Sequence, residues 1–187
     1  MKKIAILMMV MGIATMGMLG SAKAADLYLG GKIPIAIPLP DFNKALGVGG
    51  GLVAEADYFV MPGLAVTGEF GFIHHGGKDI TVTIPFLGTT TVKGDSTTQV
   101  PLMVGVRYEF MEGPLKPFAH LRLGLNFLVG GVTNTKFGLN FGGGVLYEVI
   151  ESLDVGGSLE FGFAGLDGNA ADQMHFIINI MALYGLM

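Results

Sequence analysis

Residues 118–129 read FAHLRLGLNFLV, and this stretch decides the fold of the chain. Every second residue from Ala119 to Val129 is apolar, whereas Arg122 and Asn126 occupy alternate positions. Side chains of a β-strand point in turn to the two faces of a sheet, so a period of two predicts a strand with one apolar face and one mixed face. The stretch is also long enough for a tilted strand to cross a bilayer, which takes ~9–11 residues.

The same alternation recurs along the rest of the chain. The predicted strands are 27–38, 46–59, 64–75, 99–110, 118–129, 137–149, 153–164 and 173–186. One face of every strand lacks Asp, Glu, Lys and Arg, although 14% of the chain is charged. A charge at the bilayer midplane costs ~2–4 kcal/mol, so a surface in contact with lipid excludes such residues.

Two arguments place the apolar face outside the barrel. The interior of an eight-stranded barrel is just wide enough for side chains, and so many large apolar residues would not fit there. The other face also carries too little charge for a soluble surface. The sequence therefore predicts an all-β fold, an eight-stranded antiparallel up-and-down transmembrane β-barrel, whose closure leaves no backbone edge unpaired in lipid.

The first residues have the pattern of an export signal. Lys2 and Lys3 precede an apolar run, and Ala22-Lys23-Ala24 is a small-x-small cleavage site. We expect a signal peptide over residues 1–24 and a barrel domain over 25–187. Export of a barrel predicts the outer membrane of a Gram-negative bacterium as its location. The chain has no cysteine, and its net charge of −4 gives no reason to expect nucleic acid.

The connections predict the orientation of the barrel. Those after the second, fourth and sixth strands are tight, whereas those after the first, third, fifth and seventh include the longest. Short turns of such barrels face the periplasm and long loops face outside. All five tyrosines then lie at periplasmic strand ends, and several phenylalanines lie at the outer rim, so the sequence predicts two aromatic girdles.

The signal, the alternating strands, the tight inner turns and the girdles together resemble the small eight-stranded outer-membrane β-barrel family. The nearest architecture is the membrane domain of outer membrane protein A and similar small surface barrels. The resemblance covers the whole chain after the signal and rests on pattern rather than on a motif. It implies a monomer that contacts outer-membrane lipids and lipopolysaccharide and is inserted by the barrel assembly machinery. Barrels of this family usually end on an aromatic residue, whereas this chain ends Leu186-Met187.

The inward face carries the candidate site, a set of charged side chains in the lumen. Its members are Lys32, Glu55, Asp57, Glu69, Arg107, Glu109, His120, Arg122, Glu148 and Glu160. One interpretation is an ion path or gate, and the other is a structural network that satisfies buried charge. The narrow lumen favours the structural network. Six acids face three Lys and Arg side chains, so we expect three carboxylates to lack a base of their own.

The outer half of the inward face is rich in glycine and predicts either a small cup for a hydrophobic ligand or a wall that curves around large inward neighbours.

A second distinctive segment is the loop 76–98, where Thr alternates with Val or Ile and predicts a hairpin above the membrane. Ile84, Phe86 and Leu87 at its tip form a possible surface contact. A variable loop without a partner accounts for the segment equally well.

These features favour a non-enzymatic barrel with a structural or surface-interaction role. The alternative is a narrow, porin-like channel or carrier for small hydrophobic molecules, and a third class is a lipid A-modifying enzyme. Catalysis by a barrel needs a nucleophile beside a histidine and a carboxylate, and the alternating pattern places no such set together. We expect no cofactor and no metal, and the pattern names no external partner.

Overall fold

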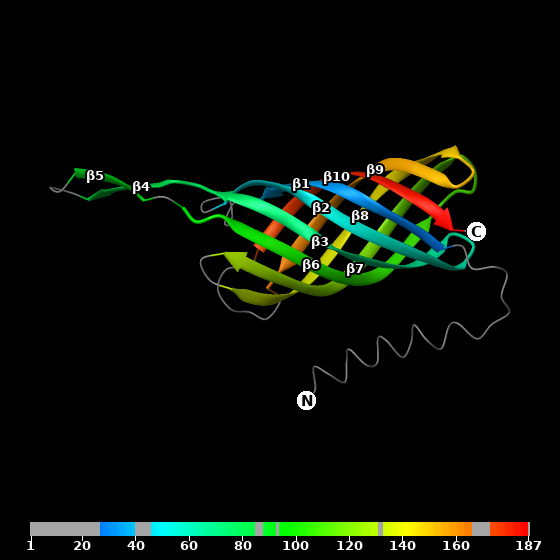
Figure 1. The fold of residues 1–187 in the computed structure, drawn as a ribbon, viewed down its shortest axis with the longest axis horizontal. Helices are drawn as coiled ribbons and strands as arrows, with labels where there is room; N and C mark the ends of the chain where they lie inside the picture. The colour runs from blue at the N-terminus through cyan, green and yellow to red at the C-terminus, as the bar shows by residue number, and fades with distance from the viewer. Residues whose placement is uncertain are drawn as a thin grey trace, which may run out of the picture.

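The computed structural model describes residues 27–39, 46–84, 88–92, 94–130, 133–165 and 173–186. Eight strands form a closed antiparallel barrel in the order β1-β10-β9-β8-β7-β6-β3-β2 (Figure 1). The barrel strands are β1 (Leu27–Pro38), β2 (Leu46–Met61), β3 (Leu64–Gly77), β6 (Thr97–Glu109), β7 (Leu115–Gly130), β8 (Asn134–Ile150), β9 (Leu153–Ala164) and β10 (Gln173–Leu186). The predicted fold class is confirmed.

Pairing of the first and last strands closes the barrel. Leu27 lies opposite Leu186 and Pro38 lies opposite His175, so β1 is paired with β10 over its whole length. The end of β10 and the three short connections lie at one end of the barrel, called here the turn end (Figure 1). The longer connections lie at the opposite end, called here the loop end. None of the described residues forms a helix long and apolar enough to cross a membrane.

Several strands extend beyond the predicted ranges. β7 begins at Leu115 and β8 at Asn134, each three residues earlier than the alternation of large apolar residues suggested. The added positions include Lys116 and Lys136, whose side chains point inward. The apolar pattern marks only the band in contact with lipid, and a strand continues past that band wherever its backbone hydrogen bonds continue.

The predicted faces hold along the strands, with one exception at the start of β2. Phe70 and Ile180 are 58% and 63% exposed, whereas Arg107 and Leu183 are fully buried. Leu46 was expected on the lipid face, but it is buried. The pairing of β2 with β3 shifts register between Leu46 and Gly49, and one extra residue in a strand moves side chains to the other face.

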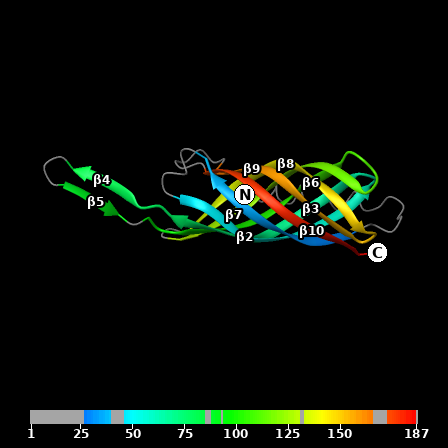
Figure 2. The ribbon, with the colours of Figure 1, turned by 90° about the horizontal axis from the view of Figure 1, so that it is seen from above.

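The loop between β3 and β6 forms the expected hairpin. β4 (Ile80–Ile84) and β5 (Gly88–Val92) pair antiparallel as a separate two-stranded sheet, with Ile80 opposite Val92. The hairpin projects from the loop end, well beyond the barrel (Figures 1 and 2). Ile84 ends β4, whereas Phe86 and Leu87 lie outside the described residues, as does the signal segment 1–24.

Inward glycines allow the wall of this narrow barrel to curve. At Gly105 of β6, a Cβ atom would lie 2.6 Å from the Cα of Arg122 on β7 and closer still to the carbonyl oxygen of Leu121. The two backbones approach so closely here that a side chain has no room. Glycine within a strand commonly marks such a close approach or bend.

Candidate functional site: the barrel interior

A cluster of charged side chains fills the middle of the lumen. Lys32, Glu55, Glu69, Arg122 and Glu160 come from five strands and are all buried, and we call them the central network. The Lys32 ammonium lies 2.5 Å from Glu69 and 3.2 Å from Glu55. The Arg122 guanidinium lies 2.5 Å from Glu55 and 3.3 Å from Glu69. Each cation thus bridges the same two carboxylates.

Glu160 completes the central network from the opposite wall. Its Oε1 lies 3.4 Å from the Lys32 ammonium and 3.5 Å from the Arg122 guanidinium. Asn179 donates a hydrogen bond of 2.8 Å to the same oxygen, and Ser158 donates one of 3.1 Å. The Nε2 atom of His120 lies 3.6 Å away. Several donors thus converge on one carboxylate, which compensates for its removal from water.

A second group of ionic contacts, the Arg107 group, lies toward the turn end. The Arg107 guanidinium lies 2.5 Å from Asp57 and 3.0 Å from Glu109. It also sits between two aromatic rings, with 5.5 Å from its central carbon to the ring centroids of Phe59 and Phe118. A distance of 4.0 Å from Arg107 to Glu55 connects this group to the central network.

Glu148 does not belong to either cluster. It was predicted as one of the lumen charges, but it lies near the turn end and its side chain is 34% exposed. Its partner is Lys116, 3.0 Å away, which also lies 3.0 Å from buried Asp154. We call these three residues the basal group. The tilt of the strands places Glu148 nearer the turn end than its position in the sequence suggested.

The expectation that three carboxylates lack a base was wrong. It left out Lys116 and assumed that each base serves one acid, whereas Lys32 and Arg122 each contact three. Every acid named in the three groups has at least one ion-pair partner within 4.0 Å. Lys116 and Asp154 were missed. Both stand at inward positions when the alternation of their strands is continued, so the alternation could have placed these two side chains in the lumen.

Two apolar clusters lie on either side of the ionic contacts. Toward the loop end, Ala36, Val53, Ile73 and Ile177 pack together and are buried. Toward the turn end, Phe118, Leu146, Met181 and Leu183 form a second cluster against which Tyr28 packs. The outer half of the lumen, for which the sequence left open a ligand cup or a curved wall, therefore contains packed aliphatic side chains. Together with the central network, these clusters fill the lumen with buried side chains.

A polar layer lies above the outer apolar cluster, at the loop end. Gln99 donates a hydrogen bond of 2.6 Å to Asn126, and both are buried. His75 and His175 face each other with 5.2 Å between ring centroids. Sequence reasoning missed this layer because it treated His74 and His75 as the end of a strand, whereas β3 continues to Gly77.

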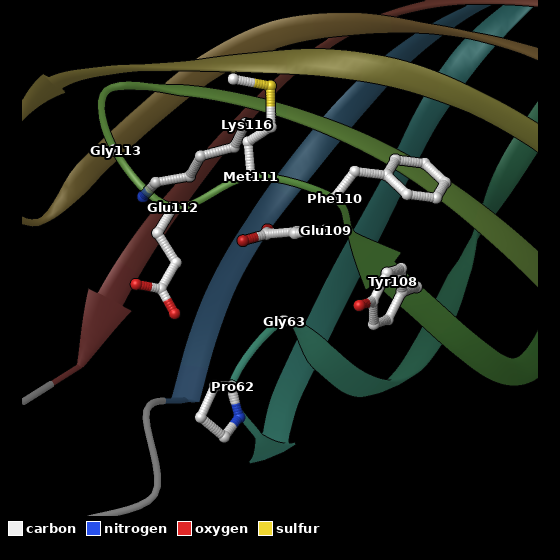
Figure 3. Close-up of a pocket in the computed structure, with 9 residues that line it drawn as sticks. All are labelled: Pro62, Gly63, Tyr108, Glu109, Phe110, Met111, Glu112, Gly113 and Lys116. Atoms are coloured by element: carbon white, nitrogen blue, oxygen red, sulfur yellow. The ribbon is translucent and has the colours of Figure 1, made fainter.

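A hollow of about 330 Å³ lies at the turn end, beside the basal group. Figure 3 shows Glu109, Glu112 and Lys116 around it, all from β6, β7 and the connection between them. Pro62 and Gly63 border it from the β2–β3 turn. Glu109 and Lys116 at this hollow hold ion pairs with Arg107 and with Glu148 and Asp154. The two side chains therefore already have partners.

The filled lumen, the lipid-facing apolar wall and the short turns all agree with one family of proteins. Residues 5–180 match the outer membrane protein beta-barrel domain. The chain belongs to this family. A comparison with the curated proteins finds no significant match.

Several solved structures share the fold. The outer membrane protein OprG from Pseudomonas aeruginosa superposes with a TM-score of 0.60 at 15% identity, covering 89% of this chain and 98% of that protein. Neisserial surface protein A gives a TM-score of 0.57 at 16% identity, covering 84% and 96%. Ail of Yersinia pestis, in complex with the heparin analogue sucrose octasulfate, gives 0.50 at 12% identity, covering 87% and 97%. At such identities the likeness concerns the fold.

Proposed function

We propose that this protein is a closed, non-enzymatic outer-membrane barrel that holds its β4–β5 hairpin above the cell surface, in a structural or surface-interaction role. The observation that carries the proposal is the filled lumen. Two side chains of the ionic groups, Arg107 and Arg122, are at most 1% exposed. Two side chains of the apolar cluster at the turn end, Leu146 and Leu183, are fully buried. A path for solutes would require both kinds of cluster to move.

The orientation of the barrel follows from its two ends. The turn end faces the periplasm and the loop end faces outside, because outer-membrane barrels place short turns inside. Exposed Tyr108, Tyr147 and Tyr184 then lie near the periplasmic interface, and Phe72 and Phe137 lie near the outer one. The lipid partners are outer-membrane lipids and lipopolysaccharide. The barrel assembly machinery inserts the chain.

Export uses residues 1–24 as a signal peptide, cleaved after Ala24. The positive start, the apolar run and the Ala-x-Ala site support this proposal. Mass measurement of the protein purified from outer membranes tests it, and the expected mass is that of residues 25–187. The mass of the uncleaved chain, or a protein recovered in the inner membrane, would contradict the export proposal.

Conductance measurements test the closed lumen. The purified barrel in planar bilayers should show no single-channel conductance, and vesicles containing it should take up small hydrophobic molecules no faster than empty vesicles. Steady conductance or accelerated uptake would instead favour the narrow channel or carrier. Mass analysis of lipid A from cells with and without the gene tests the enzyme class. A difference in lipid A would overturn the non-enzymatic assignment.

Deletion of the hairpin tests the surface role. Cells that display the full chain and cells that display a chain without residues 79–93 should carry equal amounts of folded barrel. Only the full chain should support surface contact, measured as adhesion of the cells to a hydrophobic surface. Equal adhesion of both strains, with adhesion above that of cells lacking the gene, would place the contact on another loop. No adhesion by either strain would leave the structural role as the proposal.

A further inference from the structure

Two histidines meet at the loop end from strands that are not neighbours. His75 stands near the end of β3 and His175 near the start of β10, with β1 and β2 between them in the barrel order. Both side chains are buried, at 1% and 2% exposed. Their ring centroids lie 5.2 Å apart and their planes differ by 31°. Neither ring takes part in the central network.

A backbone contact fixes the tautomer of His75. Its Nδ1 lies 3.2 Å from the carbonyl oxygen of Gly47. A carbonyl can only accept a hydrogen bond, so Nδ1 carries the proton and Nε2 of the neutral ring carries the lone pair. Histidines that bind metals are commonly held in this way, with the second ring nitrogen donating to a carbonyl or carboxylate.

The ring separation suits a shared metal ion. A zinc ion bonded at ~2.0–2.1 Å to one nitrogen of each ring lies about 3.2 Å from each centroid, and a tetrahedral angle then separates the centroids by about 5.2 Å. The observed 5.2 Å agrees with that value. Gln173 lies one inward position above His175 on β10 and is 7% exposed, and its Oε1 has no hydrogen-bond partner among the described residues.

We propose that His75 and His175 bind one late first-row divalent metal ion, of the class Zn²⁺, Ni²⁺ or Cu²⁺, at the outer mouth of the barrel, with the amide oxygen of Gln173 as a third ligand. Imidazole nitrogen with neutral oxygen suits these ions better than Ca²⁺ or Mg²⁺. The described residues contain no group of three or more His, Asp or Glu side chains that fits a metal. As far as the described residues go, water or an external ligand would take the remaining coordination positions.

Zinc titration of the folded barrel in detergent tests the proposal. Isothermal calorimetry should give one Zn²⁺ per chain, and His75→Ala and His175→Ala should each weaken binding by about 100-fold or more. His74→Ala is the matched control, because His74 is exposed on the outer face of the same strand and contacts Thr98. This variant should bind Zn²⁺ as the natural protein does.

A second pair of variants leaves both imidazoles in place. A Cβ atom at Gly49 would lie 2.6 Å from Cε1 and Nδ1 of His75, so Gly49→Ala must displace the ring. At the neighbouring Gly50, the nearest atom to an added Cβ is 3.8 Å away. Gly49→Ala should therefore lose affinity, whereas Gly50→Ala should not, and both should keep heat-modifiable migration on gels.

Three results would overturn the metal site. The first is no Zn²⁺ binding by the natural protein. The second is an equal loss of binding in His74→Ala and His75→Ala, which would indicate chelation by exposed histidines. The third is equal binding of Zn²⁺ by Gly49→Ala and Gly50→Ala, because displacement of the His75 ring would then have no effect on zinc affinity.

Discussion

Individual charges in this lumen are stabilised by sharing. Glu160 receives contacts from Lys32, Arg122, Asn179 and Ser158, all onto one oxygen. Burying a single ion costs several kcal/mol, and close partners with additional hydrogen bonds offset that cost. Loss of one shared base therefore leaves more than one buried carboxylate short of an ion-pair partner.

Removal of Arg122 should consequently destabilise the barrel. Arg122→Ala leaves Glu55, Glu69 and Glu160 with fewer partners, and breaking a buried ion pair typically costs ~3–5 kcal/mol. Urea unfolding in lipid vesicles measures the loss. Glu148→Ala is the control, and it should cost less because the Glu148 side chain is 34% exposed at the turn end and Lys116 keeps its ion pair with Asp154. Unchanged stability of Arg122→Ala together with a large new conductance would instead identify Arg122 as a gate.

The outer face allows a test at single positions. Val104 lies in the middle of β6 and is 47% exposed on the apolar face. Val104→Arg should reduce the unfolding free energy by ~2–4 kcal/mol, whereas Val129→Arg, near the loop end of β7, should cost only ~0–1 kcal/mol. The same urea titration in vesicles compares them. Equal costs at both positions would mean that Val104 does not lie at bilayer depth.

The direction of each side chain could be predicted from sequence, but its partners could not. Alternation placed Lys32, Glu55, Arg107 and Arg122 inside, because a strand has a period of two. Which charges meet depends on the tilt of the strands and the stagger between them, which no single segment encodes. Glu148 was misplaced for this reason, and the His75–His175 pair was missed because its members lie far apart in sequence.

At the scale of elements, the β4–β5 hairpin differs from the rest of the molecule. The barrel strands each pair on both sides, whereas β4 and β5 pair only with each other. A two-stranded hairpin is marginally stable by itself, so it contributes little to the stability of the barrel. Its alternation of Thr with Val or Ile predicted the strands well. The bulge near Leu46 was not predictable, because several glycines of β2 hide the change of register.

Protease treatment of whole cells should locate the hairpin. A lysine-specific protease should cut at Lys78 or Lys93, which flank the hairpin outside the cell, and spare Lys116 at the turn end. Cleavage products identified by mass spectrometry give the positions. Broken cells serve as the control, since the protease then reaches both ends of the barrel. Cleavage at Lys116 on intact cells, with the hairpin untouched, would reverse the orientation.

At the scale of the whole molecule, most barrel strands pair with the strands next to them in the sequence, and the barrel is closed by the pairing of the first strand with the last. Among the described barrel strands, β1 and β10 are the one pair of hydrogen-bonded neighbours that lie far apart in the sequence. The sequence predicted closure by a physical argument, because an open sheet would leave unpaired backbone groups in lipid. It did not predict the register of that seam, which sets how far each inward residue lies from the turn end.

An engineered disulfide across the seam tests the register. Gly31 on β1 lies opposite Ala182 on β10. Paired residues of antiparallel strands have Cα atoms about 4.5–5.5 Å apart, within the range that a disulfide spans. The chain has no cysteine of its own, so Gly31→Cys with Ala182→Cys can form only the intended bridge within one chain. Oxidation of the folded barrel should link the two cysteines, and the unfolded, non-reduced protein should then migrate faster on gels.

The control pair, Ile35→Cys with Ala182→Cys, lies four residues out of register and should stay reduced. Bridging by the control pair alone would show that β1 and β10 pair in a different register from the one described.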